Sequence, residues 1–385
     1  MGDLTTSIIV YSLTALVLYT LAKDMVREDA ISLSRYGAHS NMWSASFIMS
    51  ILFFAIIAGA RYNTGVDHLS YLNAYQEGGN ESGELFFYTI SHYMHALGFH
   101  YFFYFALWAS IQIAFIYLAC KNRRELLPFI ALAIMLGPYF LEWMNGIRQT
   151  MVACFFVYII SYLCYNKSTK GFIISAICML VSVGFHKSAV ILLPLLFLCL
   201  LNIHLTKRTL NIGIVFVCVI LGMTPHWIGM TSGDISEFLT ILGYDYYSDT
   251  YDDMVSYADF TETAWGPLRS SAFIVDLFII WFFPKIKEYY PNDKMLNSFF
   301  FLFFIGACAY NLLANTNLLL LRPVMYFQIF KLPMVAYLLC YLAHRKSIWF
   351  YFVALLEYTY ALIDVLKVGI TGLKEYNLYH FFFLQ

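Results

Sequence analysis

The sequence predicts an all-α polytopic integral membrane protein with about 12 transmembrane helices. Hydrophobic residues make up 61% of the 385 residues and charged residues only 12%, whereas about a quarter of a soluble domain is charged. The mean hydropathy is +0.68. The apolar runs are continuous over roughly 16 to 22 residues, and the strands of a membrane barrel would alternate instead. Because backbone groups in lipid must be paired internally, these runs are predicted to be helices.

Charged residues, glycines, prolines and asparagines mark the breaks between the apolar runs. The predicted spans are 5–22, 43–60, 101–119, 126–141, 149–165, 171–185, 188–203, 210–225, 268–283, 296–315, 323–342 and 347–366. The first run lacks an A-x-A cleavage site and is followed by Lys23 and Arg27, so we expect a retained anchor. Residues 376–385 are apolar and are expected to form an interfacial tail. With no repeat and no soluble segment, residues 1–385 are predicted to form a single transmembrane domain.

The basic residues predict the orientation, because Lys and Arg are retained on the cytoplasmic side. With the N-terminus outside, alternate loops carry 15 of the 23 Lys and Arg residues, and all 15 are then cytoplasmic. Five further basic residues stand alone near outer ends of spans: Arg61, Arg148, Lys187, Arg269 and Arg322. These exceptions are candidates for function. The net charge of -1 gives no basic surface for nucleic acid, which is not expected as a partner.

Two outer loops are long. In residues 61–100, Glu84, Tyr88, His92 and His95 recur at helical spacing among apolar residues, which predicts an amphipathic helix in the outer interface. The loop at 226–267 has eight acidic residues, five tyrosines and no Lys or Arg. Acidic and aromatic side chains suit contact with sugars, and a solvated acidic lid explains the same composition.

Four of the five lone basic residues lie in four short outer segments, 61–67, 145–149, 185–188 and 321–326. An arginine in the apolar region costs about 2.5 to 3.5 kcal/mol or more on insertion scales, so several at one depth need acidic partners or a bound anion. Guanidinium groups match phosphate oxygens in bidentate geometry. We therefore predict a site for a lipid-linked diphosphate, with these binding residues: Arg61, Arg148, Lys187, Arg322, Gln149 and Tyr326. The alternative is that the arginines reach the interface or form ion pairs with nearby carboxylates.

His186 is the first candidate for a proton acceptor. The adjacent charge of Lys187 favours the neutral imidazole, which is the form that accepts a proton. Asp67, Glu84 and Glu142 are rivals for the role, because glycosyl transfer commonly uses a carboxylate. The three carboxylates and His186 all remain open at this stage.

Other polar groups are interpreted as structural. His92 and His95, with His68 nearby, have a spacing that is only a weak signal for metal, and no metal site is expected. Asp276 and Lys331 both lie about eight residues inside spans that begin at the outer face, so they are predicted to form an ion pair. The eight cysteines contain no CxxC pair and are interpreted as small core residues.

At these residues the chain resembles the EpsG family of polysaccharide polymerases, relatives of the Wzy O-antigen polymerases. The resemblance runs from Arg61 to Tyr326 in order and spacing. The matching motifs are 61–65, 67–71, 84–88, 148–149, 185–189 and 322–323, with Tyr326. The resemblance implies a metal-independent, GT-C-like membrane glycosyltransferase without a cofactor. It would join undecaprenyl-diphosphate-linked repeat units into O-antigen, capsule or exopolysaccharide on the outer side of a bacterial cytoplasmic membrane.

The resemblance also implies roles and partners. A growing glycan on undecaprenyl diphosphate would be the donor and a single lipid-linked unit the acceptor, and a chain-length regulator is a further expected partner. The four basic residues of the site would neutralise the leaving diphosphate in place of a metal. His186 or a carboxylate would take the hydroxyl proton, and a direct displacement would invert the anomeric centre.

Three other functions compete with polymerisation. A flippase or transporter of lipid-linked oligosaccharide would usually carry its ionisable groups near the bilayer midplane or on related halves of the chain. An O-antigen ligase would use the same arginines and histidine, and only the resemblance favours the polymerase over it. A membrane acyltransferase would present a histidine toward the cytoplasm. His39, His204 and His344 lie on that side without a carboxylate close by in sequence.

Overall fold

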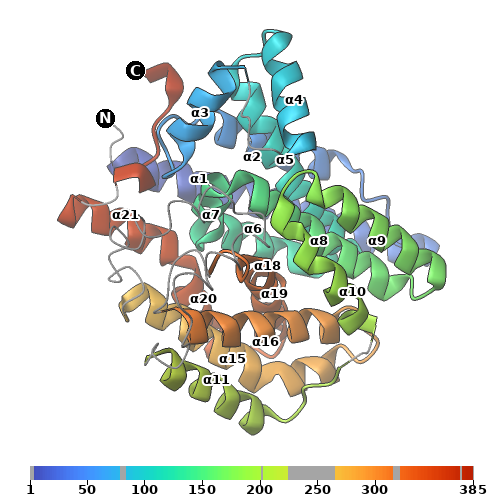
Figure 1. Ribbon diagram of the computed structural model, residues 1–385. Coiled ribbons are helices and arrows are strands. Elements are labelled where there is room, and N and C mark those ends of the chain that lie inside the picture. Colours follow the sequence, from blue (N-terminus) through green and yellow to red (C-terminus); the bar gives the residue numbers. More distant parts are fainter. Residues whose placement is uncertain are drawn as a thin grey trace, which may run out of the picture. The chain divides into compact units, whose positions relative to one another are not determined.

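A computed structural model (Figure 1) describes residues 4–78, 84–200, 203–223, 265–314, 321–372 and 375–384, without the side chains of 198–200. These residues form helices, turns and connecting segments, and the one isolated β-bridge among them joins Arg61 to Phe381. The predicted all-α class is confirmed. The acidic, tyrosine-rich loop at 226–267 lies outside the described residues apart from 265–267, and its role stays a prediction.

The chain forms two compact units. The first unit is Met1–Tyr158 with Val335–Gln385, and the second is Ile159–Met334. Helices of the first unit are α1 (Leu4–Tyr36), α2 (Ala45–Gly59), α3 (His68–Gln76), α4 (Leu85–Ala96), α5 (Tyr101–Ala119), η1 (Arg124–Leu126), α6 (Leu127–Leu136), α7 (Tyr139–Asn145), α20 (Trp349–Tyr358), α21 (Tyr360–Thr371), η5 (Glu375–Asn377) and η6 (Phe382–Leu384). Helices of the second unit are α9 (Thr169–Val183), η2 (Lys187–Ile191), α10 (Leu192–Leu200), α11 (Arg208–Gly222), α15 (Pro267–Tyr289), α16 (Leu296–Leu313) and α18 (Met325–Gln328). Two helices, α8 (Ile147–Tyr165) and α19 (Lys331–His344), cross from one unit to the other.

Among the described residues, six helices are long and apolar enough to cross a membrane, and a bent pair makes a seventh candidate. The six are α1, α5, α8, α15, α16 and residues 325–344. The bent pair consists of Arg124–Leu136 and Tyr139–Asn145, which together cover the predicted span 126–141. The two helices are bent by 64° at the break between them. Gly137 and Pro138 stand at the break, where Gly137 adopts an extended backbone and proline has no amide hydrogen for the helix ladder. Five shorter apolar helices cover other predicted spans. The protein is therefore a multi-pass membrane protein, and the number of 12 spans stays a prediction.

Helix α1 organises the first unit, because it packs against α2, α6 and α21. It is 33 residues long and continues well past the predicted end at residue 22. Its apolar first half gives way to a charged second half, which begins at Lys23. Along α1, Ser7 and Asp29 are separated by 22 residues, or about 33 Å at 1.5 Å per residue. That length matches the hydrocarbon core of a bilayer.

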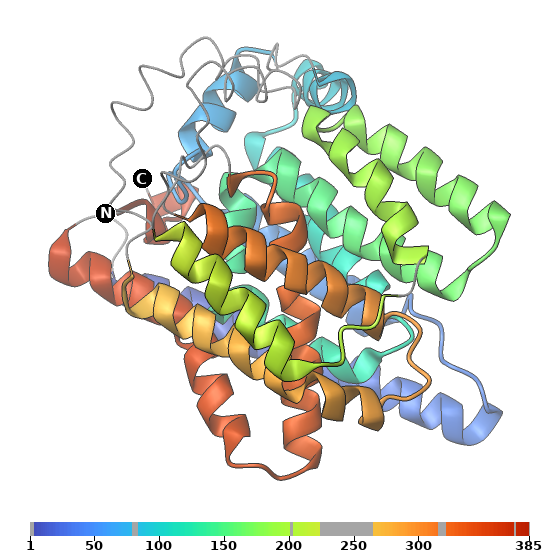
Figure 2. The same cartoon turned by 60° about the horizontal axis from the view of Figure 1, so that its bottom comes forward.

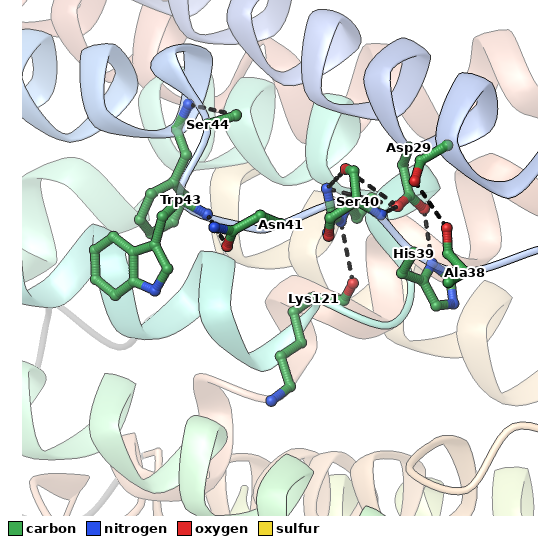
Figure 3. A network of polar contacts seen from close by, with 11 residues as sticks. Asp29, Ala38, His39, Ser40, Asn41, Trp43, Ser44 and Lys121 are labelled. Atoms are coloured by element: carbon green, nitrogen blue, oxygen red, sulfur yellow. Dashed lines mark hydrogen bonds and ion pairs between the residues drawn. The ribbon is translucent and has the colours of Figure 1, made fainter. Parts of the chain in front are cut away.

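A buried polar network closes the loop at the charged end of α1 (Figure 3). Asp29 accepts a hydrogen bond from the Ser40 amide at 2.9 Å, and its other oxygen lies 2.8 Å from His39 Nδ1. Arg124 is 3% exposed and donates to the Ser40 hydroxyl at 2.6 Å and to the Ser40 carbonyl oxygen. The sequence places no carboxylate near His39, so this partnership appears only in the fold. The network fixes the turn between α1 and α2.

The C-terminal segment is inserted into the opposite end of the first unit. The start of α1 and the end of the chain lie side by side in both views (Figures 1 and 2). Tyr379 is fully buried, and its amide donates to the Ser7 hydroxyl at 2.8 Å. The Tyr62 amide donates to the His380 carbonyl at 2.8 Å, and the Gly65 amide donates to the Tyr376 carbonyl at 2.7 Å. The first part of the segment 376–385 thus pairs with the loop after α2, and its position in the membrane interface stays a prediction.

In the second unit, α16 packs against α11 and α18. A Cβ atom on Gly306 would lie 2.9 Å from the backbone of Phe327, so this glycine lets α16 and α18 approach closely. The predicted ion pair is confirmed, because Lys331 Nζ lies 2.8 Å from the Asp276 carboxylate. Lys331 also donates to the Ala272 carbonyl at 2.8 Å. These contacts join α15 to α19 inside the spans.

Candidate functional site

The loop after α2 carries the first predicted segment, and Arg61 holds it together. Arg61 is fully buried; its Nε donates to the Ala58 carbonyl at 3.1 Å and its Nη1 to the Thr64 carbonyl at 2.7 Å. The guanidinium carbon lies 4.7 Å from the centre of the Phe105 ring. Burial lowers the pKa of Arg61 to about 10, and the hydroxyl of Tyr379 opposes this shift. The arginine is therefore turned into the protein, with only Nη2 lacking a hydrogen-bond partner.

Gly65 brings this loop against the end of α7. Its φ of +96° lies in the region that residues with a Cβ atom rarely adopt. A Cβ at this position would stand 2.4 Å from Asn145 Oδ1 and 3.5 Å from Arg61 Nη1. The close approach joins two of the predicted segments, 61–67 and 145–149. Position 65 therefore requires glycine for two reasons: its backbone has a positive φ, and Asn145 leaves no room for a Cβ atom.

His68, at the start of α3, is fully buried between aromatic rings. It stacks on Phe105 with ring centres 4.6 Å apart, and the edge of Tyr62 lies 5.9 Å away. Neither ring nitrogen has a hydrogen-bond partner. Burial, with a smaller contribution from the charge of Arg61, lowers the pKa of His68 from 6.5 to about 2. The imidazole is neutral in the folded protein.

This burial predicts a stability that depends on pH. Below pH 6.5 the unfolded chain binds a proton at His68 and the folded chain does not, so the protein loses stability as the pH falls. The loss from this group is about 1.4 kcal/mol for each pH unit below that value. The His68→Leu variant is expected to lose less stability than the wild type between pH 6.5 and 5.5 in detergent, measured by thermal unfolding. Equal losses in both proteins would contradict the assignment.

Arg148, in the first turn of α8, forms an ion pair with Glu84 at the start of α4. Arg148 Nη1 lies 2.6 Å from Glu84 Oε2, and the side chains are 24% and 5% exposed respectively. The guanidinium carbon also lies 5.7 Å from the centre of the Phe87 ring and 5.8 Å from that of Tyr71. The ion pair is one of the alternatives that the sequence left open for Arg148. It leaves part of the arginine at the surface of the first unit.

The helix predicted around residues 84 to 95 exists as α4. Phe87 and Ser91 are both 2% exposed, and Glu84 is buried on the same face, one turn earlier. Leu85 is 65% exposed and Tyr93 63% exposed. The position of α4 in a membrane interface stays a prediction.

The other candidates of the first unit are Asp67 and Gln149. Asp67 is partly exposed and stands immediately before α3, one helical turn ahead of Tyr71. Gln149 is 6% exposed and follows Arg148 on α8. From the sequence, Tyr71 has no role beyond its place in a motif, and Phe87 has none. Tyr71 follows Asp67 by four residues and Phe87 follows Glu84 by three, and this helical spacing could have predicted that their rings lie near the candidate site.

The three histidines considered for a metal have separate surroundings. His92 Nδ1 lies 2.8 Å from the Gly78 carbonyl, and its ring stacks on Tyr88. His95 contacts the edge of the Tyr75 ring, and His68 is enclosed as described above. Each ring thus has an aromatic neighbour of its own.

The second unit joins the other two predicted segments. The Ser188 and Tyr326 hydroxyls are hydrogen bonded at 2.9 Å, and both residues are at most 1% exposed. His186 is 8% exposed and immediately precedes η2, whereas Lys187 and Arg322 are partly exposed. The short η2 and α18 are thereby tied together beside two basic side chains.

The predicted residues thus form two clusters, one in each unit. The first cluster contains Arg61, Asp67, Glu84, Arg148 and Gln149. The second contains His186, Lys187, Arg322 and Tyr326. That all nine act on one substrate stays a prediction.

Comparison with known proteins gives one match. A family model described as the EpsG family matches residues 44–379, which is well over half of the chain. This range includes both clusters and, of the C-terminal residues that pair with the Arg61 loop, Tyr376 but not His380. No curated protein and no solved structure matches the chain.

Proposed function

The chain belongs to the EpsG family of polysaccharide-polymerase-like membrane proteins, and on this premise we propose that it polymerises lipid-linked oligosaccharide repeat units. The donor is a growing glycan on undecaprenyl diphosphate, and the acceptor is a single lipid-linked unit. The reaction takes place at the outer face of a bacterial cytoplasmic membrane and makes O-antigen, capsule or exopolysaccharide. The enzyme is then a GT-C-like glycosyltransferase.

The Arg148 cluster is the observation that carries this proposal. It contains a partly exposed guanidinium, a carboxylate and two aromatic rings, a combination suited to an anionic lipid diphosphate and its attached sugar. Helix α2 begins beside the Arg124 network and ends beside the Arg61 loop, so the two polar regions lie at opposite ends of the first unit. The end of the first unit that contains the Arg124 network (the Arg124 end) also carries Lys121 and Arg35, and the rule that positive residues stay inside assigns it to the cytoplasm. The opposite end, which contains the Arg61 loop and Arg148, is then outside.

In the proposed reaction a hydroxyl oxygen of the acceptor sugar attacks the anomeric carbon of the donor. The bond from that carbon to the diphosphate oxygen breaks, and undecaprenyl diphosphate leaves as the anion. Arg148, Lys187 and Arg322 stabilise its charge, which makes a metal unnecessary. His186 takes the hydroxyl proton, with Asp67 as the alternative acceptor. A single displacement inverts the anomeric centre.

The supporting residues shape the site. Arg61 is buried on two carbonyl groups, and we propose that it fixes the loop that carries Asp67. Gln149 lies beside Arg148 in the first turn of α8, and we assign it to binding of the diphosphate or the substrate. The hydrogen bond between the Ser188 and Tyr326 hydroxyls keeps Arg322 and Lys187 on neighbouring segments.

The function is tested by the polysaccharide ladder of cells lacking the gene, complemented with the wild type, Arg148→Ala, His186→Ala or Arg322→Ala at matched expression. We expect the deletion and the three variants to leave single repeat units on the surface carrier, because each variant loses a group that acts on the diphosphate or the proton. Arg123→Ala, at the Arg124 end, is the matched control and should give the wild-type ladder. Failure of any unit to reach the outer face would favour a flippase. Full-length chains that are not attached to their final acceptor would favour a ligase.

A further inference from the structure

We propose that Glu84 is a positioning residue for Arg148 and not a proton acceptor. This inference rests on the proposed polymerase function and deepens it. Glu84 fixes the direction of the Arg148 guanidinium and offsets part of its charge. Arg148 can therefore bind the diphosphate of the donor and release the lipid diphosphate that is left after transfer.

The surroundings of Arg148 show how Glu84 acts. The 2.6 Å contact joins Glu84 Oε2 to one terminal nitrogen of the guanidinium. Phe87, on the same face of α4 as Glu84, stacks on Trp108 with ring centres 4.6 Å apart. Phe87 and Trp108 are 2% and 1% exposed, so this side of the site is part of the packed core. The guanidinium is thus held by a carboxylate and a rigid ring at once, and its orientation is set before a ligand arrives.

The same geometry makes Glu84 a poor proton acceptor. Its side chain is 5% exposed, and an acceptor must come within about 3 Å of the substrate hydroxyl. Its Oε2 atom is already in contact with Arg148 Nη1, at 2.6 Å. Asp67 is partly exposed and His186 lies in the other cluster, and these two residues remain the candidates for proton transfer.

Glu84 also limits the charge that a ligand meets. An arginine paired with a buried carboxylate attracts an anion less strongly than an unpaired arginine, because the carboxylate repels the anion. Removing the carboxylate has two effects. The guanidinium loses its fixed direction, which weakens binding of the donor. Its uncompensated charge retains the product more tightly, because the free terminal phosphate of the product carries more negative charge than the glycosylated diphosphate of the donor.

The test uses purified full-length protein in detergent and lipid-linked repeat units extracted from cells that lack the gene. The variants are Glu84→Gln, Glu84→Asp and the exchange pair Glu84→Arg with Arg148→Glu. Glu77→Gln, an exposed residue at the end of α3, is the control. Each protein is first checked by gel filtration and thermal unfolding. Rates are then measured against substrate concentration and pH.

A positioning role predicts that Glu84→Gln raises KM about tenfold or more and changes kcat by less than about threefold, since about 1.4 kcal/mol of ground-state and transition-state binding is lost together. Inhibition by added undecaprenyl diphosphate becomes stronger, and the acidic limb of the pH profile is unchanged. Glu84→Asp recovers part of the loss. The exchange pair folds but makes no polymer, because the cation no longer stands where the diphosphate binds.

Other results would overturn the proposal. If kcat of Glu84→Gln falls about 100-fold with KM unchanged and the acidic limb is lost, Glu84 is the proton acceptor. If the exchange pair polymerises like the wild type, the ion pair is structural only. Both of these outcomes leave the polymerase function intact. If the wild-type protein itself makes no polymer from these units, the proposed function fails instead.

Discussion

Replacing Lys331 by Met is expected to lower the free energy of unfolding by about 3 kcal/mol or more. The carboxylate of Asp276 lies 2.8 Å from Lys331 Nζ, and the two side chains are only 11% and 16% exposed. Without the lysine, a buried charge has no partner inside the spans. Desolvation then opposes folding, or the carboxyl group must take up a proton. Thermal unfolding of the purified protein in detergent measures the loss.

The double variant Lys331→Met with Asp276→Leu is the control for this interpretation. Removing both charges leaves no unpaired group, and such replacements of buried ion pairs are often neutral. We expect the double variant to be more stable than Lys331→Met alone. A double variant that is as unstable as the sum of two severe single losses would show that the side chains act by packing and not by charge.

Gly65→Ala is expected to destabilise the first unit and to abolish chain growth. The added Cβ would stand 2.4 Å from Asn145 Oδ1, and the φ of +96° adds about 1 to 2 kcal/mol of backbone strain. The loop must then move away from α7 and from Arg61. Because this loop carries Asp67, the substitution is expected to change the candidate site and also to lower the stability of the first unit. The unfolding temperature and the polysaccharide ladder are the two measurements.

The Gly37→Ala variant separates the effect of backbone strain from the effect of the steric clash. Gly37 also has a positive φ, of +64°, but nothing lies within 4 Å of its Cβ position. This variant therefore has the strain without the clash, and it lies at the other end of α1. We expect a small loss of stability and a normal ladder. Equal effects of the two alanines would mean that the contact between Gly65 and Asn145 is unimportant.

The helical class and the positions of the apolar helices could be predicted because continuous apolar runs leave few alternatives in lipid. Gly137 and Pro138 are helix-breaking residues, but the residues on both sides are apolar, so the sequence predicted one continuous span where the structure has a bend of 64°. The length of α1 was underestimated because charged residues after Lys23 end the hydropathy signal and not the helix. The ion pair of Asp276 and Lys331 was predictable from their equal depth in two spans.

The sequence suggested candidate residues for the site, but it could not give their pairings. A lone arginine at the outer end of a span indicates either a binding site for an anion or an ion pair. Only the fold identifies Glu84 as the partner of Arg148. Arg61 gave the same signal, and the fold turns it onto Ala58 and Thr64. The pairing of residues 60–65 with 376–382 joins parts of the chain more than 300 residues apart. No local pattern carries such a contact.

The polymerase proposal is tested most directly by mixing the purified wild-type protein with lipid-linked repeat units extracted from cells that lack the gene, in the presence of a metal chelator, and resolving the products by size. We expect a ladder of glycans on lipid diphosphate, release of one lipid diphosphate for each linkage, and inversion at each new linkage. We expect none of these with Arg148→Ala. Single repeat units that stay unchanged with active, folded wild-type protein, or a ladder that Arg148→Ala makes equally well, would contradict the polymerase proposal.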